Sequence, residues 1–151
     1  MKKIFIDMDG VLADFNAVFS EERRHELYQE GFFASLEPMF VKEVLERELD
    51  FLRLKGYQIN ILSKAVTSEF CRKEKIDWLK RHAPKFDNVY IVEGDESKNL
   101  FLEVGAILFD DYSKNLIEWK EAGGKAVKVG GRHKDDFAHI QHISELVEVI
   151  I

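Results

Sequence analysis

The sequence predicts an α/β fold, in which a Rossmann-like parallel sheet is flanked by helices and a small helical cap follows the first strand. Short apolar runs alternate with helical segments, which indicates successive βα units. Residues 16–55 interrupt this alternation with two helical patterns and no strand signal. The length of 151 residues and the apolar fraction of 46% suit one domain with a substantial core. We therefore expect a single domain, residues 1–151, with a cap insertion at residues 16–55.

The first predicted strand ends in two closely spaced carboxylates. An apolar run from Ile4 to Ile6 is typical of a buried strand, and it stops at Asp7. Asp9 follows two positions later, and Gly10 comes next. Open α/β sheets bind ligands outside the carboxyl ends of their strands, so this position favours a binding site. Carboxylates are costly to bury without compensation, which a metal ion could supply.

Four further apolar runs and two amphipathic segments complete the predicted core. Each run is short enough for a buried strand, and Gly123–Gly124 would end the second helix. Strands that alternate with helices form parallel sheets through right-handed crossovers. The predicted strands are Tyr57–Leu62, Val89–Val92, Ala106–Phe109 and Ala126–Val129, and the predicted helices are Thr67–His82 and Ser113–Ala122.

The predicted cap leaves the chain where the first two carboxylates emerge. Its two helical patterns are separated by residues 31–34. In the second pattern Val41, Leu45 and Leu49 share one face, and Pro38 suits the first turn. An insertion that begins at this point would lie over the carboxylates.

Composition and charge exclude several classes of protein. The net charge of −6 disfavours a nucleic-acid polymer as partner, because such proteins cluster excess Lys and Arg. No apolar stretch approaches the ~20 residues of a membrane span, so we expect no membrane partner. One cysteine, Cys71, and an N-terminus without a signal-peptide pattern favour the cytoplasm. The apolar segment from Ile143 to Ile151 could dock on the sheet or on a second subunit, which leaves a homodimer open.

Polar side chains also accompany the later predicted strands. Ser63 follows the second strand, and Lys98 precedes the fourth. The pair Asp110–Asp111 follows the fourth strand, so parallel strands would bring these groups to the first two carboxylates. Two unit charges about 4 Å apart repel by roughly 4 kcal/mol at an effective dielectric of 20, so clustered carboxylates need a cation. Oxygen ligands at an open site favour Mg²⁺, and Lys98 would bring a second positive charge.

These residues resemble, in the same order, the four motifs of the haloacid dehalogenase-like (HAD) phosphohydrolases. The run from Asp7 to Leu12 is similar to the first motif, and Ser63 to the second. Lys98 is similar to the third motif, and Asp110–Asp111 to the acidic fourth. Any one motif is weak, but four in order across residues 7–111 are a specific signal. The resemblance implies a HAD-type fold and a phosphomonoester hydrolase.

The same resemblance implies a Mg²⁺-dependent mechanism through an aspartyl phosphate. Asp7 would attack the phosphorus, and Asp9 would protonate the leaving oxygen and then activate water. Ser63 and Lys98 would bind the transferring phosphoryl oxygens. The implied metal site consists of the Asp7 side chain, the Asp9 backbone carbonyl and one carboxylate of the pair Asp110–Asp111. We expect Asp111 to be the direct ligand and Asp110 to support it, and the sequence leaves the choice between these two open.

A narrower resemblance concerns the 5′(3′)-deoxyribonucleotidases, the cytosolic type C 5′-nucleotidases. The run from Asp7 to Phe15 is similar to theirs, and residues 31–34 resemble the aromatic base-binding stretch of their cap. This resemblance implies a pyrimidine deoxynucleoside monophosphate as the small-molecule substrate. Stacking of a base on an aromatic side chain is worth ~1–3 kcal/mol. The implied substrate-binding residues are Phe15, Phe32, Phe33 and Ala34.

Three other interpretations stay open on the sequence. Phe32 and Phe33 could pack in the core between cap and sheet instead of contacting a base. The protein could be a HAD phosphatase for another small phosphometabolite. It could also be a receiver-like phospho-aspartate signalling domain, although receivers carry their acidic pair after the first strand and have no insertion there.

Overall fold

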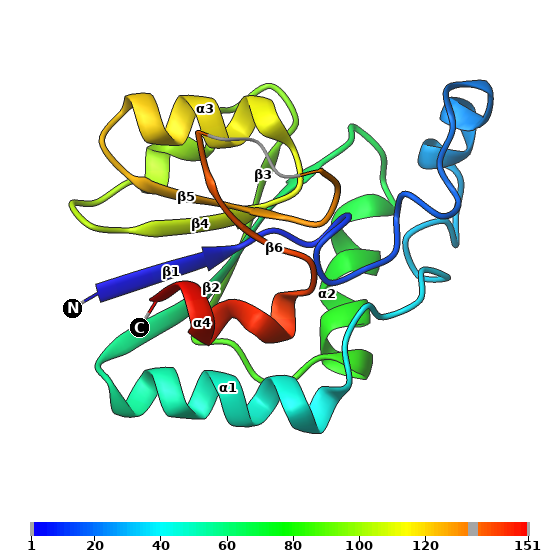
Figure 1. The fold of residues 1–151 in the computed structure, drawn as a ribbon. Helices are drawn as coiled ribbons and strands as arrows, with labels where there is room; N and C mark the ends of the chain where they lie inside the picture. Colours follow the sequence, from blue (N-terminus) through cyan, green and yellow to red (C-terminus); the bar gives the residue numbers. More distant parts are fainter. Residues whose placement is uncertain (1, 133–135, 151) are drawn as a thin grey trace.

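The structure is a computed structural model that describes residues 2–132 and 136–150. These residues form one six-stranded sheet with the order β3-β2-β1-β4-β5-β6, in which every neighbouring pair is parallel. This is the predicted Rossmann-like α/β fold (Figure 1). The strands are β1 (Lys2–Ile6), β2 (Tyr57–Ala65), β3 (Asn88–Glu93), β4 (Ile107–Asp110), β5 (Lys125–Val129) and β6 (Ala138–Ile140).

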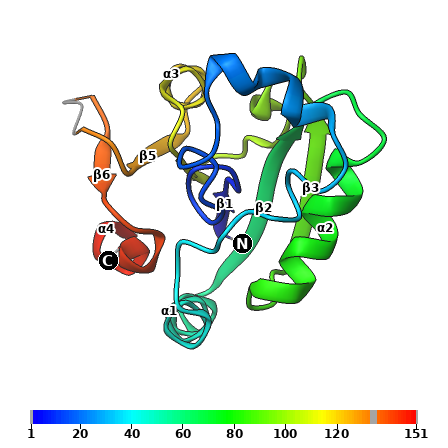
Figure 2. The same ribbon diagram turned by 90° about the vertical axis from the view of Figure 1, so that its right-hand side faces the viewer.

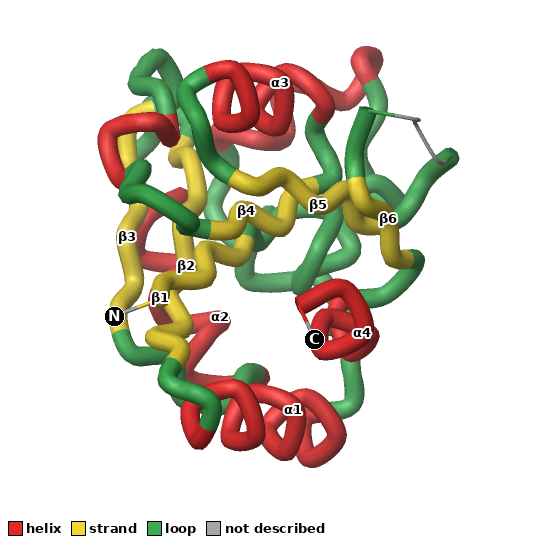
Figure 3. Tube along the Cα trace, turned by 60° about the vertical axis from the view of Figure 1, so that its left-hand side comes forward, coloured by secondary structure: helices red, strands yellow, loops and turns green. Residues whose placement is uncertain are grey.

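Helical elements cover both faces of the sheet (Figure 3). Side chains alternate along a strand, so Ile4 and Ile6 of β1 join the larger apolar cluster and Phe5 joins the smaller one. Burial on both faces explains why the strands are continuous apolar runs in the sequence. The larger cluster includes buried side chains of α1, α2 and α4, and the smaller one those of α3. The helices are α1 (Lys42–Leu54), α2 (Cys71–His82), α3 (Ser113–Glu121) and α4 (Leu146–Ile150), and the 3₁₀ helices are η1 (Glu21–Tyr28), η2 (Lys98–Phe101) and η3 (Ile143–Glu145).

The region predicted as a cap, residues 16–55, divides into two parts. A loop of residues 14–37 leaves and re-enters the core at one place, because Ala13 pairs with Pro38 in an isolated bridge. η1 belongs to this loop and lies on the carboxyl side of the sheet (Figure 2). The second part, α1, packs in the larger core cluster through its three buried leucines. Only the loop therefore approaches the carboxyl ends of the strands.

Several boundaries differ from those predicted. β2 continues to Ala65, so Ser63 lies inside a strand. α2 begins at Cys71 instead of Thr67, because the Ser68 hydroxyl accepts a hydrogen bond from the Cys71 N–H (3.1 Å) at the helix start. β6 has no counterpart in the prediction, since a strand of three residues at the sheet edge is too short to give an apolar run.

The C-terminal segment docks on the sheet. Residues 143–150 form η3 and α4, and Ile143 and Leu146 are buried in the larger core cluster. This is one of the two placements expected for the segment from Ile143 to Ile151, of which Ile151 lies outside the described residues. A homodimer stays a prediction.

Candidate active site

β1 and β4 bring two carboxylates together at the carboxyl end of the sheet. Ile6 pairs with Phe109 in the parallel register, and the Asp7 N–H continues this ladder by donating to the Phe109 carbonyl (2.9 Å). Asp110 is the last residue of β4, so its side chain emerges beside that of Asp7. Asp7 is 8% exposed and Asp110 is fully buried. Burial of two adjacent acids requires compensation from their surroundings.

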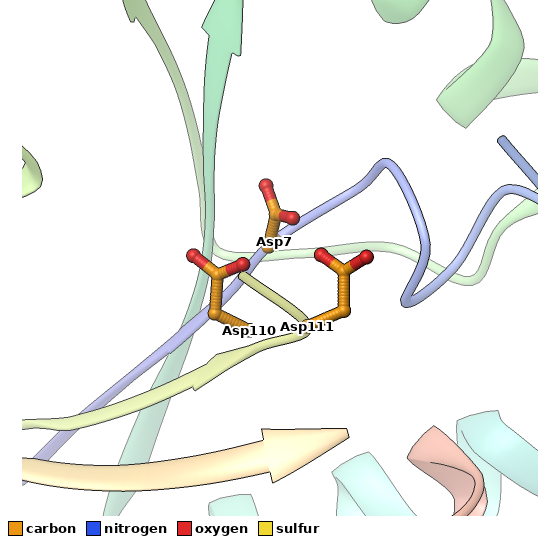
Figure 4. Close-up of side chains that lie close together, drawn as sticks. All are labelled: Asp7, Asp110 and Asp111. Carbon is orange, nitrogen blue, oxygen red and sulfur yellow. The ribbon is translucent and has the colours of Figure 1, made fainter. Parts of the chain in front are cut away.

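Asp111 adds a third carboxylate to form an acidic cluster (Figure 4). One carboxylate oxygen each from Asp7, Asp110 and Asp111 lies within 4.8 Å of the others. Figure 4 shows the three carboxyl groups pointing to the same side of the chain at the ends of β1 and β4. Hard oxygen donors gathered in this way are the ligands that Mg²⁺ prefers.

Lys98 compensates two of these carboxylates from within the core. This side chain is 2% exposed, and its Nζ donates to Asp7 Oδ1 and Asp110 Oδ2, both at 2.9 Å. Burial disfavours the charged ammonium, but the two carboxylates outweigh burial and raise the pKa of Lys98. Asp110 also accepts hydrogen bonds from the Asn115 side chain (3.1 Å) and the Tyr112 N–H (3.0 Å). Of the three carboxylates in the cluster, Asp110 therefore has its negative charge best compensated by hydrogen-bond donors.

The three carboxyl groups differ in how well their charges are compensated. Burial, followed by repulsion from Asp110, raises the pKa of Asp7 well above its usual value despite Lys98. Burial also opposes ionisation of Asp110, but Lys98 and the hydrogen bonds prevail and lower its pKa. Burial and Asp110 raise the pKa of Asp111 to about 6. Within the described part of the chain no lysine or arginine pairs with Asp111, so a divalent cation would relieve the remaining repulsion.

Gly10 provides the space in which the Asp111 carboxylate lies. Its backbone φ is +81°, in the left-handed region that favours glycine. A Cβ at this position would lie 2.0 Å from Asp111 Oδ2 and 2.5 Å from its Cγ. The turn is closed by the Gly10 N–H, which donates to the Ala13 carbonyl (2.8 Å). Glycine is therefore required here for both conformation and space.

Ser63 lies at the expected strand, but its hydroxyl does not line the cavity at the acidic cluster. The side chain is fully buried and accepts a hydrogen bond from Lys75 Nζ (2.8 Å). Lys75 is 1% exposed and also donates to Asp9 Oδ2 (2.9 Å). The structure therefore connects Ser63 and Asp9 through a buried lysine that the motifs do not include.

A cavity of about 330 Å³ opens next to the acidic cluster. This volume is within the range of small-molecule sites, ~300–1,000 Å³. Phe15 and Phe19 stack with ring centroids 4.9 Å apart, and both rings line the cavity. The lining residues are Asp7, Asp9, Phe15, Asn16, Phe19, Lys64, Lys98, Asp111, Tyr112 and Asn115.

Three residues expected to contact a base do not line this cavity: Phe32, Phe33 and Ala34. Phe32 is 9% exposed and Phe33 is 3% exposed, and both belong to the larger core cluster. Phe15 stacks on Phe33 with ring centroids 6.4 Å apart, so the buried rings support Phe15 from the core side. This is the core-packing interpretation that the sequence left open, and its physical cause is the burial of two large apolar rings against neighbouring rings.

Sequence reasoning missed several residues of the site. Lys75 had a usable signal, because it lies on the apolar stripe of α2 with Cys71 and Trp78. A lysine at such a buried position needs a polar partner. The other residues reach the cavity from the loop of residues 14–37, from the end of β2 and from the start of α3, where no local pattern marks them. They are Asn16, Phe19, Lys64, Tyr112 and Asn115.

The parallel sheet with an acidic cluster and a buried lysine at its carboxyl edge is the arrangement that the resemblance to HAD phosphohydrolases implies. The fold is similar to that of D,D-heptose 1.7-bisphosphate phosphatase from B. bronchiseptica, solved with magnesium and phosphate, at a TM-score of 0.62 and 11% identity. That match covers 99% of this chain and 98% of the other. A Had-superfamily hydrolase from Ehrlichia chaffeensis matches at a TM-score of 0.60 and 12% identity, covering 98% and 95% of the two chains.

The chain belongs to the family described as 5′ nucleotidase, deoxy (Pyrimidine), cytosolic type C protein, whose sequence pattern matches residues 20–151. The protein is accordingly a phosphomonoester hydrolase of the 5′-nucleotidase type, and this membership disfavours the receiver-like alternative. A search of the curated proteins found no match. Across residues 2–132 and 136–150, no helix has the length and apolar character needed to cross a membrane.

Proposed function

We propose that this protein hydrolyses pyrimidine deoxynucleoside monophosphates through an aspartyl-phosphate intermediate, with Mg²⁺ as its cofactor. One observation carries the proposal. Carboxylate oxygens of Asp7, Asp110 and Asp111 lie within 4.8 Å of one another, beside a cavity lined by Phe15 and Phe19. A nucleophile, a set of metal ligands and an aromatic surface for a base thus share one cavity. The family description, which names pyrimidine and deoxy substrates, supports the same class.

Asp7 is the proposed nucleophile. A bond between its carboxylate oxygen and the phosphorus would form as the ester P–O bond breaks, which gives aspartyl phosphate and the free nucleoside. Lys98 would stabilise the transferring phosphoryl group at the same time. Two of the three Nζ protons of Lys98 are donated to Asp7 and Asp110, which leaves one for a phosphoryl oxygen.

Asp9 is the proposed acid and base. Its Oδ2 accepts a hydrogen bond from Lys75, whereas Oδ1 is buried and has no hydrogen-bond partner among the described residues. Oδ1 therefore has the lone pair that would carry a proton to the leaving oxygen of the nucleoside. In the second step the same oxygen would accept a proton from the water that hydrolyses the aspartyl phosphate.

Two lysines are the proposed cationic contacts of the substrate phosphate. Lys98 and Lys64 both line the cavity, whereas the predicted contact Ser63 is buried behind it. The Ser63 hydroxyl accepts a hydrogen bond from Lys75, so its proposed contribution is to the strand end from which Lys64 projects. A second cation would favour binding of a phosphate dianion near the acidic cluster.

The proposed Mg²⁺ site uses the Asp7 carboxylate, the Asp9 backbone carbonyl and Asp111. We propose Asp111 as the direct ligand, because Asp110 already accepts hydrogen bonds from Lys98 and Asn115. A bound Mg²⁺ would neutralise charge on the phosphoryl oxygens and favour ionised Asp7.

A pyrimidine base would stack on the aromatic part of the cavity. Phe15 and Phe19 are the proposed stacking surface, with Phe32 and Phe33 supporting Phe15 from the core. The proposed cap is the loop of residues 14–37, which carries both stacking rings. We propose that the protein acts in the cytoplasm, in agreement with the cytosolic description of its family.

A phosphate-release screen tests this function. The purified protein is incubated with dUMP, dTMP, dAMP, UMP and p-nitrophenyl phosphate, with either Mg²⁺ or EDTA. We expect Mg²⁺-dependent release, highest with the pyrimidine deoxynucleotides, and no turnover by Asp7→Asn. Asp77→Asn, which changes an exposed carboxylate on α2, is the matched control and should keep native activity.

Each result decides a separate part of the proposal. Robust turnover by Asp7→Asn would refute the nucleophile, and equal activity in EDTA would refute the metal. Preference for a phosphomonoester without a base would refute the nucleotide substrate and favour another small phosphometabolite.

A further inference from the structure

We propose that Lys75 is a positioning residue that fixes the Asp9 carboxylate for proton transfer and connects it to the aromatic loop. The aromatic loop is defined as residues 31–34. This inference rests on the proposed function, in which Asp9 exchanges the proton.

The hydrogen-bond donors of Lys75 are fully used inside the protein. Its Nζ donates to Asp9 Oδ2 (2.9 Å), Ser63 Oγ (2.8 Å) and the Lys64 carbonyl (2.7 Å). The side chain is 1% exposed and, unlike Lys98, does not line the cavity, so the ammonium does not face a substrate there. An ammonium has three N–H donors, and none remains for a phosphate. Any effect of Lys75 on the reaction must therefore pass through its partners, of which Asp9 alone is charged.

The contact restricts the orientation of Asp9. A carboxylate at a chain turn can rotate, and a charge-assisted hydrogen bond to a buried donor opposes that rotation. Oδ2 is held by Lys75, so Oδ1 remains as the oxygen for the proton. A fixed acid is catalytically useful because proton transfer requires it within hydrogen-bond reach of the leaving oxygen.

The neighbouring residue on α2 holds the aromatic loop. The Glu74 carboxylate accepts hydrogen bonds from the backbone N–H groups of Gly31 (2.7 Å), Phe33 (3.1 Å) and Ala34 (3.1 Å). The Lys75 ammonium also lies 5.0 Å from the centroid of the Phe33 ring, a cation–π distance. Two adjacent residues of α2 thus hold two parts of the site. Glu74 fixes the aromatic loop, and Lys75 fixes the Asp9 carboxylate.

Leaving-group dependence distinguishes this role from a structural one. Departure of p-nitrophenolate needs no proton, whereas departure of a nucleoside alkoxide does. The value of kcat/KM covers the steps up to leaving-group departure, so it reports how well Asp9 donates its proton to the leaving oxygen. For Lys75→Met we expect kcat/KM to fall about 100-fold with dUMP and less than about 3-fold with p-nitrophenyl phosphate. Lys73→Met, at an exposed position of the same helix, should leave both values unchanged.

A double-mutant cycle shows whether Lys75 acts through Asp9. In an Asp9→Asn background, Lys75→Met should change kcat/KM for dUMP by less than about 2-fold, because the residue it positions no longer transfers a proton. If Lys75→Met does not fold alone, Lys75→Gln retains N–H donors without the charge and supports the same comparison. Equal losses with both esters, or the same loss in the Asp9→Asn background, would overturn the inference alone. A native protein that cleaves neither ester would overturn the proposed function as well.

Discussion

Asp111→Asn should stabilise the protein in EDTA and at the same time weaken its response to Mg²⁺. Asn has nearly the shape of Asp and keeps an oxygen that can accept the hydrogen bond from Asn16 (3.2 Å in the native chain). The substitution therefore removes one negative charge from the acidic cluster with little change in packing. Because no lysine or arginine pairs with Asp111 in the described chain, its removal leaves no cation unpaired.

The size of the effect follows from the pKa of Asp111. Burial and the charge of Asp110 raise this pKa from 3.8 to about 6. A carboxyl group with a raised pKa in the folded state costs stability as the pH rises through this interval, because the unfolded chain ionises first. The cost is complete above pH 7, where it is about 3 kcal/mol at 1.36 kcal/mol per pKa unit. At pH 4.5 it is about 1 kcal/mol.

Urea denaturation in EDTA, followed by the fluorescence of the two buried tryptophans Trp78 and Trp119, measures this difference. Asp111→Asn should exceed the native protein in free energy of unfolding by about 3 kcal/mol at pH 7.5 and about 1 kcal/mol at pH 4.5. Mg²⁺ at 100 times its Kd should stabilise the native protein by about 2.7 kcal/mol and the variant by much less. A variant that is less stable than the native protein at pH 7.5, or equal stabilisation of both by Mg²⁺, would contradict the reasoning.

Three further substitutions test other parts of the site. Gly10→Ala should lower the free energy of unfolding by about 1–2 kcal/mol, because alanine is strained in a left-handed backbone. The added Cβ should also displace the Asp111 carboxylate, so the Mg²⁺ concentration needed for half-maximal activity should rise. Phe19→Ala should weaken binding of dUMP by about 1–3 kcal/mol but leave KM for glycerol 2-phosphate unchanged, and steady-state kinetics with an equal effect on both would exclude stacking. Trp78→Phe removes the indole N–H that donates to the Leu36 carbonyl (2.7 Å), and chemical denaturation should show a loss of about 1–3 kcal/mol because a buried carbonyl loses its partner.

The acidic cluster could be predicted because strand ends are visible where apolar runs stop. The runs that end at Ile6 and Phe109 are adjacent and in register in the sheet, so the acids that follow them meet. The prediction of where β2 ends is less accurate. β2 continues past the end of its apolar run, and Ser63 is therefore buried within the strand instead of facing the cavity. An apolar run marks where burial is required, but hydrogen bonding to β3 can extend a strand through polar residues.

The aromatic residues show what sequence patterns could not decide. Phe15, Phe19, Phe32 and Phe33 are chemically identical, yet the first two line the cavity and the last two lie in the core. The difference is set by the closure of the loop of residues 14–37 onto α2, through contacts separated by about forty positions in the sequence such as those of Glu74. Local periodicity contains no information about contacts at that separation.

The charges at the cavity explain why two lysines are buried beside it. Lys98 lies between Asp7 and Asp110, and Lys75 pairs with Asp9. When all four carboxyl groups are ionised, the two lysines reduce their charge from −4 to −2, which is the charge that one divalent cation neutralises. Without the lysines, a single Mg²⁺ would leave the four carboxylates with a net negative charge, and this charge would repel a phosphate dianion. The proposed magnesium site therefore depends on the two lysines as much as on its ligands. The four carboxyl groups are those of Asp7, Asp9, Asp110 and Asp111.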